Sequence, residues 1–351
     1  MITQETVLIL GAGASMAYGF PSGQKLKALI WQKLANYRDE IPIAMGANIQ
    51  SRVPKEQFGR SVEEFRNDLL LSPDYSIDSF LEHHSDKYRK LGKICIAEVL
   101  LPLERRQYLF DDWMLTLTEE NFSSIIRPKD GHWYQYLFNQ MCKDCKKFED
   151  FSNNKMSIVT FNYDRSLEYY LLACLHAKYK KDIPMCAKVL KNIPILHVYG
   201  KLGELPELSS DPKAIIPYDN LDNYFLTKYL QTAENSIKII HDPNTNTSPE
   251  FQKAQELIKK AKRIYFLGFG YLEENMKRLF TDYSASSVIE FGLLKEVKDR
   301  CCGTTLGISP HQEYRLRIKG LDRLQMSGRP TYFQDATIYD FLFYNAYARF
   351  D

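Results

Sequence analysis

The sequence lacks both a strong charge imbalance and a long apolar run. Its 351 residues include 46 Lys and Arg against 44 Asp and Glu, so no whole-molecule field attracts DNA or an anionic membrane. The apolar stretch at residues 94–103 is interrupted by Glu98 and Pro102, and no segment approaches the roughly 18 apolar residues that a membrane helix needs. We therefore expect no membrane span and no direct binding of nucleic acid.

A disulfide framework is also missing, because seven cysteines are an odd count in a long chain. Cys142 and Cys145 have the spacing of a zinc half-site, but Cys174 and Cys186 lack the matching second knuckle. We favour an amphipathic helix over residues 133–147 and no metal. The amino terminus has neither the basic region nor the apolar core of a signal peptide. These absences predict a cytoplasmic protein with reduced thiols.

What the sequence does contain is apolar strand-like runs that alternate with helical patterns. The runs cover residues 6–10, 156–161, 195–199 and 264–267, and each ends in a polar or glycine-rich turn. The alternation predicts an α/β fold, a Rossmann-like, doubly wound, mainly parallel sheet whose ligands sit at the carboxyl ends of the strands.

The domain organisation follows from where the strand signals stop and resume. Residues 1–37 and 149–351 are predicted to form the Rossmann-like core, with a first helix over residues 24–37 and a last sheet-like segment at 336–347. Residues 38–148 have mostly helical periodicity, with helix-like segments at 62–70 and 77–91, and are predicted to form a helical insertion or cap. A helix is also predicted to begin at Pro249, capped by Ser248.

The first turn carries Gly11, Ala12, Gly13 and Ser15. Glycine lets a backbone approach a pyrophosphate closely, and the amides at a helix start attract negative charge. However, Ala17 stands where a third glycine normally packs helix to strand, and no acidic residue ends a second strand as in a dehydrogenase fingerprint. A tight turn that binds nothing is the alternative interpretation.

Two further strand ends carry polar side chains. Asn162 and Asp164 follow the strand at 156–161 and could together supply donors and acceptors to a carboxamide. Alternatively, Asp164 caps the next helix. His197 lies in the strand at 195–199, where it is either a satisfied core residue or an acid or base in a cleft.

In order, these turns resemble the sirtuin superfamily. More narrowly, the chain resembles the sirtuin-like NADase domains of bacterial anti-phage defence systems. The matching segments are residues 11–23, 77–81 (Ile-Asp-Ser-Phe-Leu), 160–164, 266–270 with Glu274 and Asn275, and 303–307. Residues 38–148 and 204–260 contribute little to the resemblance.

The resemblance implies NAD as the substrate and assigns roles to single residues. Asn162, Asp164 and His197 would form the catalytic, nicotinamide-side group. The contacts to the rest of NAD would come from Gly11, Ala12, Gly13, Ser15, Pro21, Gly268, Gly270, Asn275 and Thr304. Protein-deacylating sirtuins carry a four-cysteine zinc ribbon, whereas residues 198–267 contain no cysteine here.

The function that the resemblance implies is an NAD glycohydrolase that depletes NAD in anti-phage defence. Since unregulated activity would drain the cell, we expect a homo-oligomer controlled by a partner in trans, either a HerA-type hexameric ATPase or a phage protein. The alternatives are a protein deacylase or ADP-ribosyltransferase that uses the same pocket, and a non-catalytic NAD or ADP-ribose sensor.

Overall fold

The computed structural model describes residues 1–35, 55–110, 132–219, 226–239, 248–280, 296–318, 332–344 and 350. At its centre is a six-stranded sheet in the order β3-β2-β1-β4-β5-β6, in which every pairing is parallel. The strands are β1 (Thr6–Leu10), β2 (Met156–Thr160), β3 (Ile195–His197), β4 (Arg263–Leu267), β5 (Cys301–Thr304) and β6 (Phe333–Gln334). The predicted Rossmann-like α/β fold is confirmed.

Helices cover both faces of this sheet. Parallel strands in this order are expected to be joined by right-handed crossovers, which place the helices that lead toward β3 on one face and those that lead toward β6 on the other. α7 (Trp133–Cys142) contacts both α8 (Ser166–Tyr179) and α15 (Ile338–Tyr344), whereas α11 (Pro249–Lys260) contacts α12 (Glu273–Leu279). The remaining helices beside the sheet are α9 (Ile183–Leu190) and α14 (Pro310–Ile318).

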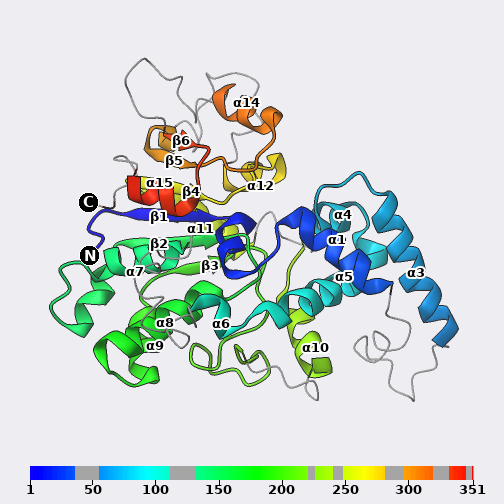
Figure 1. Ribbon diagram of the computed structural model, residues 1–351, viewed down its shortest axis with the longest axis horizontal. Helices are drawn as coiled ribbons and strands as arrows, with labels where there is room; N and C mark the ends of the chain where they lie inside the picture. Colours follow the sequence, from blue (N-terminus) through cyan, green and yellow to red (C-terminus); the bar gives the residue numbers. More distant parts are fainter. Residues whose placement is uncertain are drawn as a thin grey trace, which may run out of the picture.

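A second group of helices lies beyond the carboxyl ends of the strands (Figure 1). It consists of α1 (Gly23–Leu34), α3 (Lys55–Leu71), α4 (Ile77–His83) and α5 (Ser85–Leu100), with α10 (Leu226–Ser236) packed on α5. The short helix α6 (Arg106–Leu109) comes after α5 in the sequence. Phe65, Phe80, Leu81 and Tyr88 are buried within the group. The described elements within residues 38–148 are helices, but α7, which belongs to this range, packs against α8 and α15 beside the sheet and not within this group.

A buried ion pair fastens this group to the sheet. Arg165, which follows β2, and Glu104, which follows α5, are both almost fully buried and bonded through two pairs of atoms. Arg165 also donates to the carbonyl of Ile216. Burial raises the pKa of Glu104, while the charge and hydrogen bonds of Arg165 oppose the rise. Since all the strong donors and acceptors are matched, the pair fixes the position of the loop after β2.

Several predicted element boundaries were wrong. The single helix predicted at 77–91 is divided at His84 into α4 and α5, and the helix predicted at 133–147 ends at Cys142, so Cys145 lies beyond it. The sheet-like segment predicted at 336–347 contains helix α15, preceded by the two-residue strand β6, because a short apolar run fits either structure. Residues 36–37 and 345–347 lie outside the described residues.

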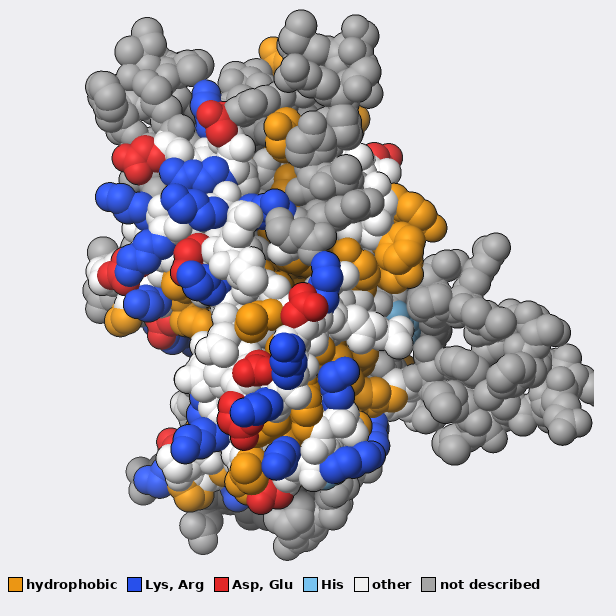
Figure 2. All heavy atoms as spheres, turned by 90° about the vertical axis from the view of Figure 1, so that its left-hand side faces the viewer, with side chains coloured by type: hydrophobic (Ala, Val, Ile, Leu, Met, Phe, Trp, Pro, Cys, Tyr) orange, Lys and Arg blue, Asp and Glu red, His pale blue; other side chains and the backbone are white. Residues whose placement is uncertain are grey.

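The start of α11 matches its prediction. Ser248 caps α11 through its side chain, with Pro249 at the first helical position. In the described part of the chain, no helix has both the length and the apolar character required to cross a bilayer. The face shown in Figure 2 carries Lys and Arg side chains interspersed with Asp and Glu, as the near balance of charges leads one to expect.

The two glycine turns touch each other directly. A Cβ added to Gly13 would lie 2.7 Å from the Cα of Gly268, and one added to Gly11 would lie 2.6 Å from the Gly268 oxygen. Gly268 has φ of 57°, and its carbonyl oxygen accepts a hydrogen bond of 2.9 Å from the amide of Gly13. The loops after β1 and β4 therefore require glycine for packing against one another, whether or not a ligand is bound.

We expect Gly268→Ala to lower the free energy of unfolding by about 3 kcal/mol or more, because it combines left-handed strain with a clash against the Gly13–Ala14 backbone. Gly307→Ala is the matched control, since Gly307 also has a positive φ but no atom within 4 Å of its added Cβ. It should cost about 1–2 kcal/mol. Denaturant titration of both variants measures the difference, and equal losses would contradict the argument.

Candidate functional site

Four loops meet at the carboxyl edge of the sheet because the strand ends are in register. Leu10 pairs with Thr160 on one side and with Leu267 on the other, and Thr160 pairs with His197. The loops that leave β1, β2, β4 and β5 therefore lie side by side, facing the helices α1 and α4 (Figure 1). This is the edge at which open α/β sheets bind ligands.

The larger of two neighbouring cavities at this edge has a volume of about 530 Å³. The loops after β1, β4 and β5 line it, together with the start of α1 and the segment around Ala336. Ala12, Gly13, Gly268, Gly270 and Thr304 are among its lining residues. None of the described residues that line it is charged, and its polar side chains are those of serine, threonine and Trp133, whose indole nitrogen donates to Ala14 O.

The smaller cavity, of about 60 Å³, adjoins the larger one, and both are lined by Ala12 and Gly23. Its polar lining comes from Ser15, Asp78, Asn162 and Asp164. A space of this size holds ordered water or one end of a ligand, whereas the larger cavity falls in the usual range of ligand sites, about 300–1,000 Å³.

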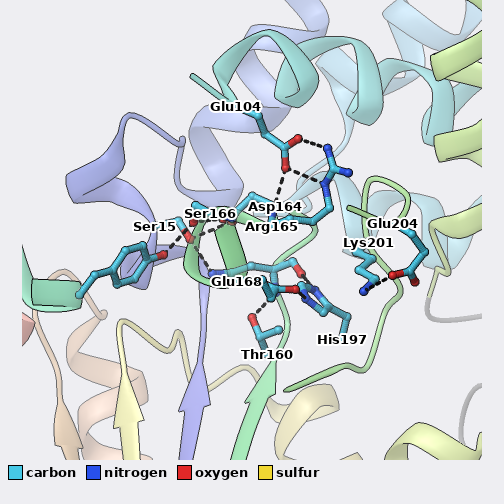
Figure 3. Close-up of polar contacts among 12 residues, drawn as sticks. Ser15, Glu104, Thr160, Asp164, Arg165, Ser166, Glu168, His197, Lys201 and Glu204 are labelled. Atoms are coloured by element: carbon cyan, nitrogen blue, oxygen red, sulfur yellow. Dashed lines mark hydrogen bonds and ion pairs between the residues drawn. The ribbon is translucent and has the colours of Figure 1, made fainter. Parts of the chain in front are cut away.

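Asp164 is the centre of a buried hydrogen-bond network (Figure 3). Its Oδ2 accepts from Ser15 Oγ at 2.8 Å, and its Oδ1 accepts from the hydroxyl and amide of Ser166. The hydroxyl oxygen of Tyr134 lies 2.8 Å from Ser166 Oγ and extends the hydrogen-bond network. Burial raises the pKa of Asp164, and the hydrogen bonds from Ser166 and Ser15 oppose the rise. Both carboxylate oxygens of Asp164 therefore accept hydrogen bonds from protein groups. The partner of Oδ1 is Ser166, the first residue of α8.

Asn162 is held so that its two polar atoms have different roles. Its amide nitrogen donates to Gly11 O at 2.9 Å and to Ser15 Oγ at 3.0 Å, which uses both hydrogens. Its backbone amide donates to Thr160 Oγ1. Among the described residues its Oδ1 has no hydrogen-bond partner, so Asn162 offers an acceptor to the smaller cavity that it lines.

His197 lies behind Asn162 and lines neither of these two cavities. Its Nδ1 is 2.8 Å from the backbone oxygen of Asn162, and its Nε2 is 2.6 Å from Glu168 Oε1 (Figure 3). Since a carbonyl only accepts, Nδ1 carries a proton and donates. Both ring nitrogens are thus used internally, which matches the interpretation of His197 as a satisfied core residue.

The structure brings most, but not all, of the predicted site residues together. Those that line one or both cavities are Ala12, Gly13, Ser15, Pro21, Asn162, Asp164, Gly268, Gly270 and Thr304. Gly11 packs beneath them against Gly268. Asn275 lines neither cavity and instead accepts a hydrogen bond of 2.7 Å from Tyr199. Thr304 accepts from the amide of Gly268 and so fixes the β4 turn.

Two carboxylates of the site were not singled out from the sequence. Glu168 looks like an ordinary helix residue, and its contact with His197 joins α8 to β3. Asp78 belongs to a motif at 77–81 that carries the family resemblance, but only packing shows that it reaches the smaller cavity. The sequence signal that could have identified Asp78 was an acidic residue in the first turn of a short helix capped by Ser76.

No group of three or more His, Cys, Asp or Glu side chains that could hold a metal ion occurs among the described residues. The seven cysteines are free thiols. Cys145 donates to Met141 O, and burial raises the pKa of both Cys142 and Cys145, which disfavours the thiolates that zinc requires.

No protein-family model matches this chain, and no curated protein matches its sequence significantly.

Acid should weaken the protein partly through Glu168. Burial opposes its ionised form, but the charge and hydrogen bond of His197, with the charge of Lys201, outweigh burial and lower its pKa to about 2. Because the folded pKa lies below the unfolded value, this stabilisation is complete above about pH 4.5 and is lost as the pH falls toward 2.

Glu168→Gln should therefore lose less stability than the wild type between pH 5 and pH 2.5, measured by urea titration at each pH, although it is less stable at pH 7. Glu256→Gln, which changes an exposed carboxylate paired with Lys253, should follow the wild-type curve. Parallel curves for Glu168→Gln and the wild type would refute the assignment.

Proposed function

We propose that this chain is an NAD glycohydrolase that cleaves the nicotinamide–ribose bond of NAD and releases nicotinamide and ADP-ribose. One observation carries the proposal. An uncharged cavity of about 530 Å³ lies at the carboxyl edge of a parallel sheet beside a small polar cavity that Asn162 lines, and the two cavities share Ala12 and Gly23 as lining residues. This arrangement suits a long substrate whose reactive end enters a separate compartment.

The larger cavity suits the ADP part of the substrate. Ser22 and Gly23, at the start of the twelve-residue helix α1, line it, and the backbone amides at a helix start favour phosphate. Opposite them, Gly270 has no atom within 4 Å of an added Cβ, so packing does not require glycine there. Its open backbone is suited to close approach by the ligand.

The smaller cavity suits the bond that breaks. The nicotinamide of NAD is a cationic leaving group, and its departure leaves an oxocarbenium-like ribose, so catalysis requires a held conformation, a water and stabilisation of positive charge. In this proposal the Oδ1 of Asn162 accepts a hydrogen bond from the carboxamide or from the attacking water. Asp164 anchors the loop through Ser15 and Ser166.

His197 acts in this proposal as a positioning residue rather than as a catalytic one. Its Nδ1–H bonds the backbone carbonyl of Asn162, so the His197–Glu168 pair holds the turn from which Asn162 projects. An altered His197 would then disturb turnover through Asn162.

The second candidate is a sensor that binds NAD or ADP-ribose without cleaving it. It is favoured by the internal engagement of both His197 and Asp164, each of which has its polar atoms occupied by protein partners. A protein deacylase or ADP-ribosyltransferase is a weaker alternative, since its acyl or protein acceptor would need further space beside the small cavity. Product analysis separates the three.

By its motif resemblance, the chain would serve as a cytoplasmic, NAD-depleting effector in anti-phage defence. A homo-oligomer, with a HerA-type ATPase or a phage protein as activating partner, is the form of control that we propose with it. Size-exclusion chromatography with light scattering would report the oligomeric state directly.

We expect Asn162→Ala to reduce nicotinamide release from NAD by about a hundredfold or more, because it removes the side-chain acceptor of the smaller cavity. The assay is chromatographic quantification of nicotinamide and ADP-ribose, with NAD affinity measured separately by calorimetry. Asn192→Ala, at an exposed amide after α9, is the matched control and should behave as wild type.

Intact NAD in the presence of tight wild-type binding would favour the sensor. Full activity of a folded Asn162→Ala variant would remove Asn162 from the mechanism.

A further inference from the structure

Asp78 is the acidic residue that the helical insertion contributes to the smaller cavity. It lies in the first turn of α4, is half-buried, and lines the cavity together with Ser15, Asn162 and Asp164. α4 belongs to a part of the chain that is distant in sequence from the strand-end turns. The insertion therefore completes the compartment in addition to covering it.

α4 is held firmly enough to fix the position of this carboxylate. Ser76 caps the helix by accepting from the amide of Ser79 at 3.1 Å, and Phe80 and Leu81 are completely buried. A Cβ added to Gly92 of α5 would lie 2.5 Å from Leu81, so the two helices pack in direct contact. A group on such a support loses little freedom when it engages a ligand.

Two polar ties from α4 to the core orient Asp78. The Tyr163 hydroxyl, next in the chain to Asn162, donates to Asp78 Oδ1. One turn further along α4, Glu82 pairs with Arg278 of α12 at 3.7 Å, and Arg278 in turn reaches the Tyr199 hydroxyl. Residues at i and i+4 share a helix face, so both ties act on the side of α4 that faces the core.

The other carboxylates near the cavity are fully engaged. Asp164 accepts from Ser15 and Ser166 through its two oxygens, and Glu168 is bound to His197 behind Asn162. Oδ2 of Asp78 is bonded to no other described side chain. The carboxylate of Asp78 accepts from Tyr163 and from its own backbone amide, so it lines the cavity and keeps acceptor capacity beyond these two hydrogen bonds.

We propose that Asp78 is a catalytic residue of this site, the base that accepts a proton from the water attacking the ribose of NAD. The inference rests on the glycohydrolase function proposed above. The bond between C1′ of the ribose and the nicotinamide nitrogen breaks, and its electron pair neutralises the pyridinium. The water oxygen bonds to C1′, and the proton that it loses passes to Oδ2 of Asp78 and then to solvent.

The environment of Asp78 favours this role. Burial raises its pKa, and the hydrogen bond from Tyr163 opposes the rise. A carboxylate with a raised pKa is a stronger base, and it still ionises below neutral pH when the rise is moderate. The ionisable or charged groups around it are Tyr163 and Asp164 after β2, Tyr199 after β3, Glu82 on its own helix and Arg278 on α12.

The proposed base is the ionised carboxylate of Asp78, and this determines how the rate of nicotinamide release changes with pH. Nicotinamide release at saturating NAD should fall as the pH drops through the raised pKa of Asp78 and should be level above it. Asp78→Asn keeps an acceptor for Tyr163 but cannot take a proton, so its residual rate should lack this acid limb.

The test uses the full chain, with NAD as the probe, and compares Asp78→Asn with Asp68→Asn. Asp68 is a suitable control because it lies in the same helical insertion and also accepts from a tyrosine hydroxyl, that of Tyr88, but lines neither cavity. Asp78→Asn should release nicotinamide about 10²- to 10⁴-fold more slowly while its affinity for NAD changes by less than about threefold. Asp68→Asn should match the wild type.

A second variant keeps the inference testable if Asp78→Asn folds poorly. In Asp78→Ala, added formate should restore part of the lost rate, because a small carboxylate can occupy the vacated space and take the proton. A merely structural role of Asp78 would give no rescue.

A folded Asp78→Asn variant with undiminished turnover, or with an unchanged acid limb, would overturn the role of Asp78 and leave the glycohydrolase intact. Absence of nicotinamide release from the wild type under every condition would overturn both.

Discussion

The direct backbone contact between the glycine turns after β1 and β4 is the constraint on which the site depends. Gly11 and Gly13 lie against Gly268 so closely that a Cβ at any of the three would meet backbone atoms. Because the two loops are in direct contact, the wall that the two cavities share at Ala12 is held in place. The same contact explains why these glycines are needed without a bound ligand, whereas packing does not require a glycine at Gly270 in the same β4 turn.

The polar side chains around this contact form two groups. Those of one group hydrogen-bond to one another, and those of the other group line the smaller cavity and keep capacity for further hydrogen bonds. Asp164, Ser15, Ser166 and Tyr134 form a hydrogen-bonded chain whose members satisfy one another. The Glu168–His197 pair does the same behind Asn162. Such satisfied networks rigidify a core, and the groups with remaining hydrogen-bonding capacity are the ones able to meet a ligand. Among the described side chains that line the smaller cavity, Asn162 and Asp78 keep such capacity.

The helical insertion has a structural role in this arrangement as well as the chemical one proposed for it. Glu104 neutralises the fully buried Arg165, which directly precedes α8, so the loop that carries Asn162 and Asp164 is tied to the end of the insertion. Removing either partner would leave an uncompensated buried charge, which costs about 3–5 kcal/mol in proteins. The insertion and the carboxyl edge of the sheet are therefore coupled through stability.

The sequence by itself determined the parallel α/β fold, four of the six strands, the capped start of α11 and the strand ends that carry Gly11, Gly13, Asn162, Asp164 and Gly268. These are local patterns of periodicity, glycine and caps, and the register of parallel strands then brings them to one edge.

Only the tertiary structure decided where side chains point. His197 turns to Glu168, Asn275 turns to Tyr199, and Asp78 enters the cavity from a distant helix. Contacts between residues far apart in sequence depend on packing, and α8, apolar on most of its surface, gives no local sign of the direction in which Glu168 faces.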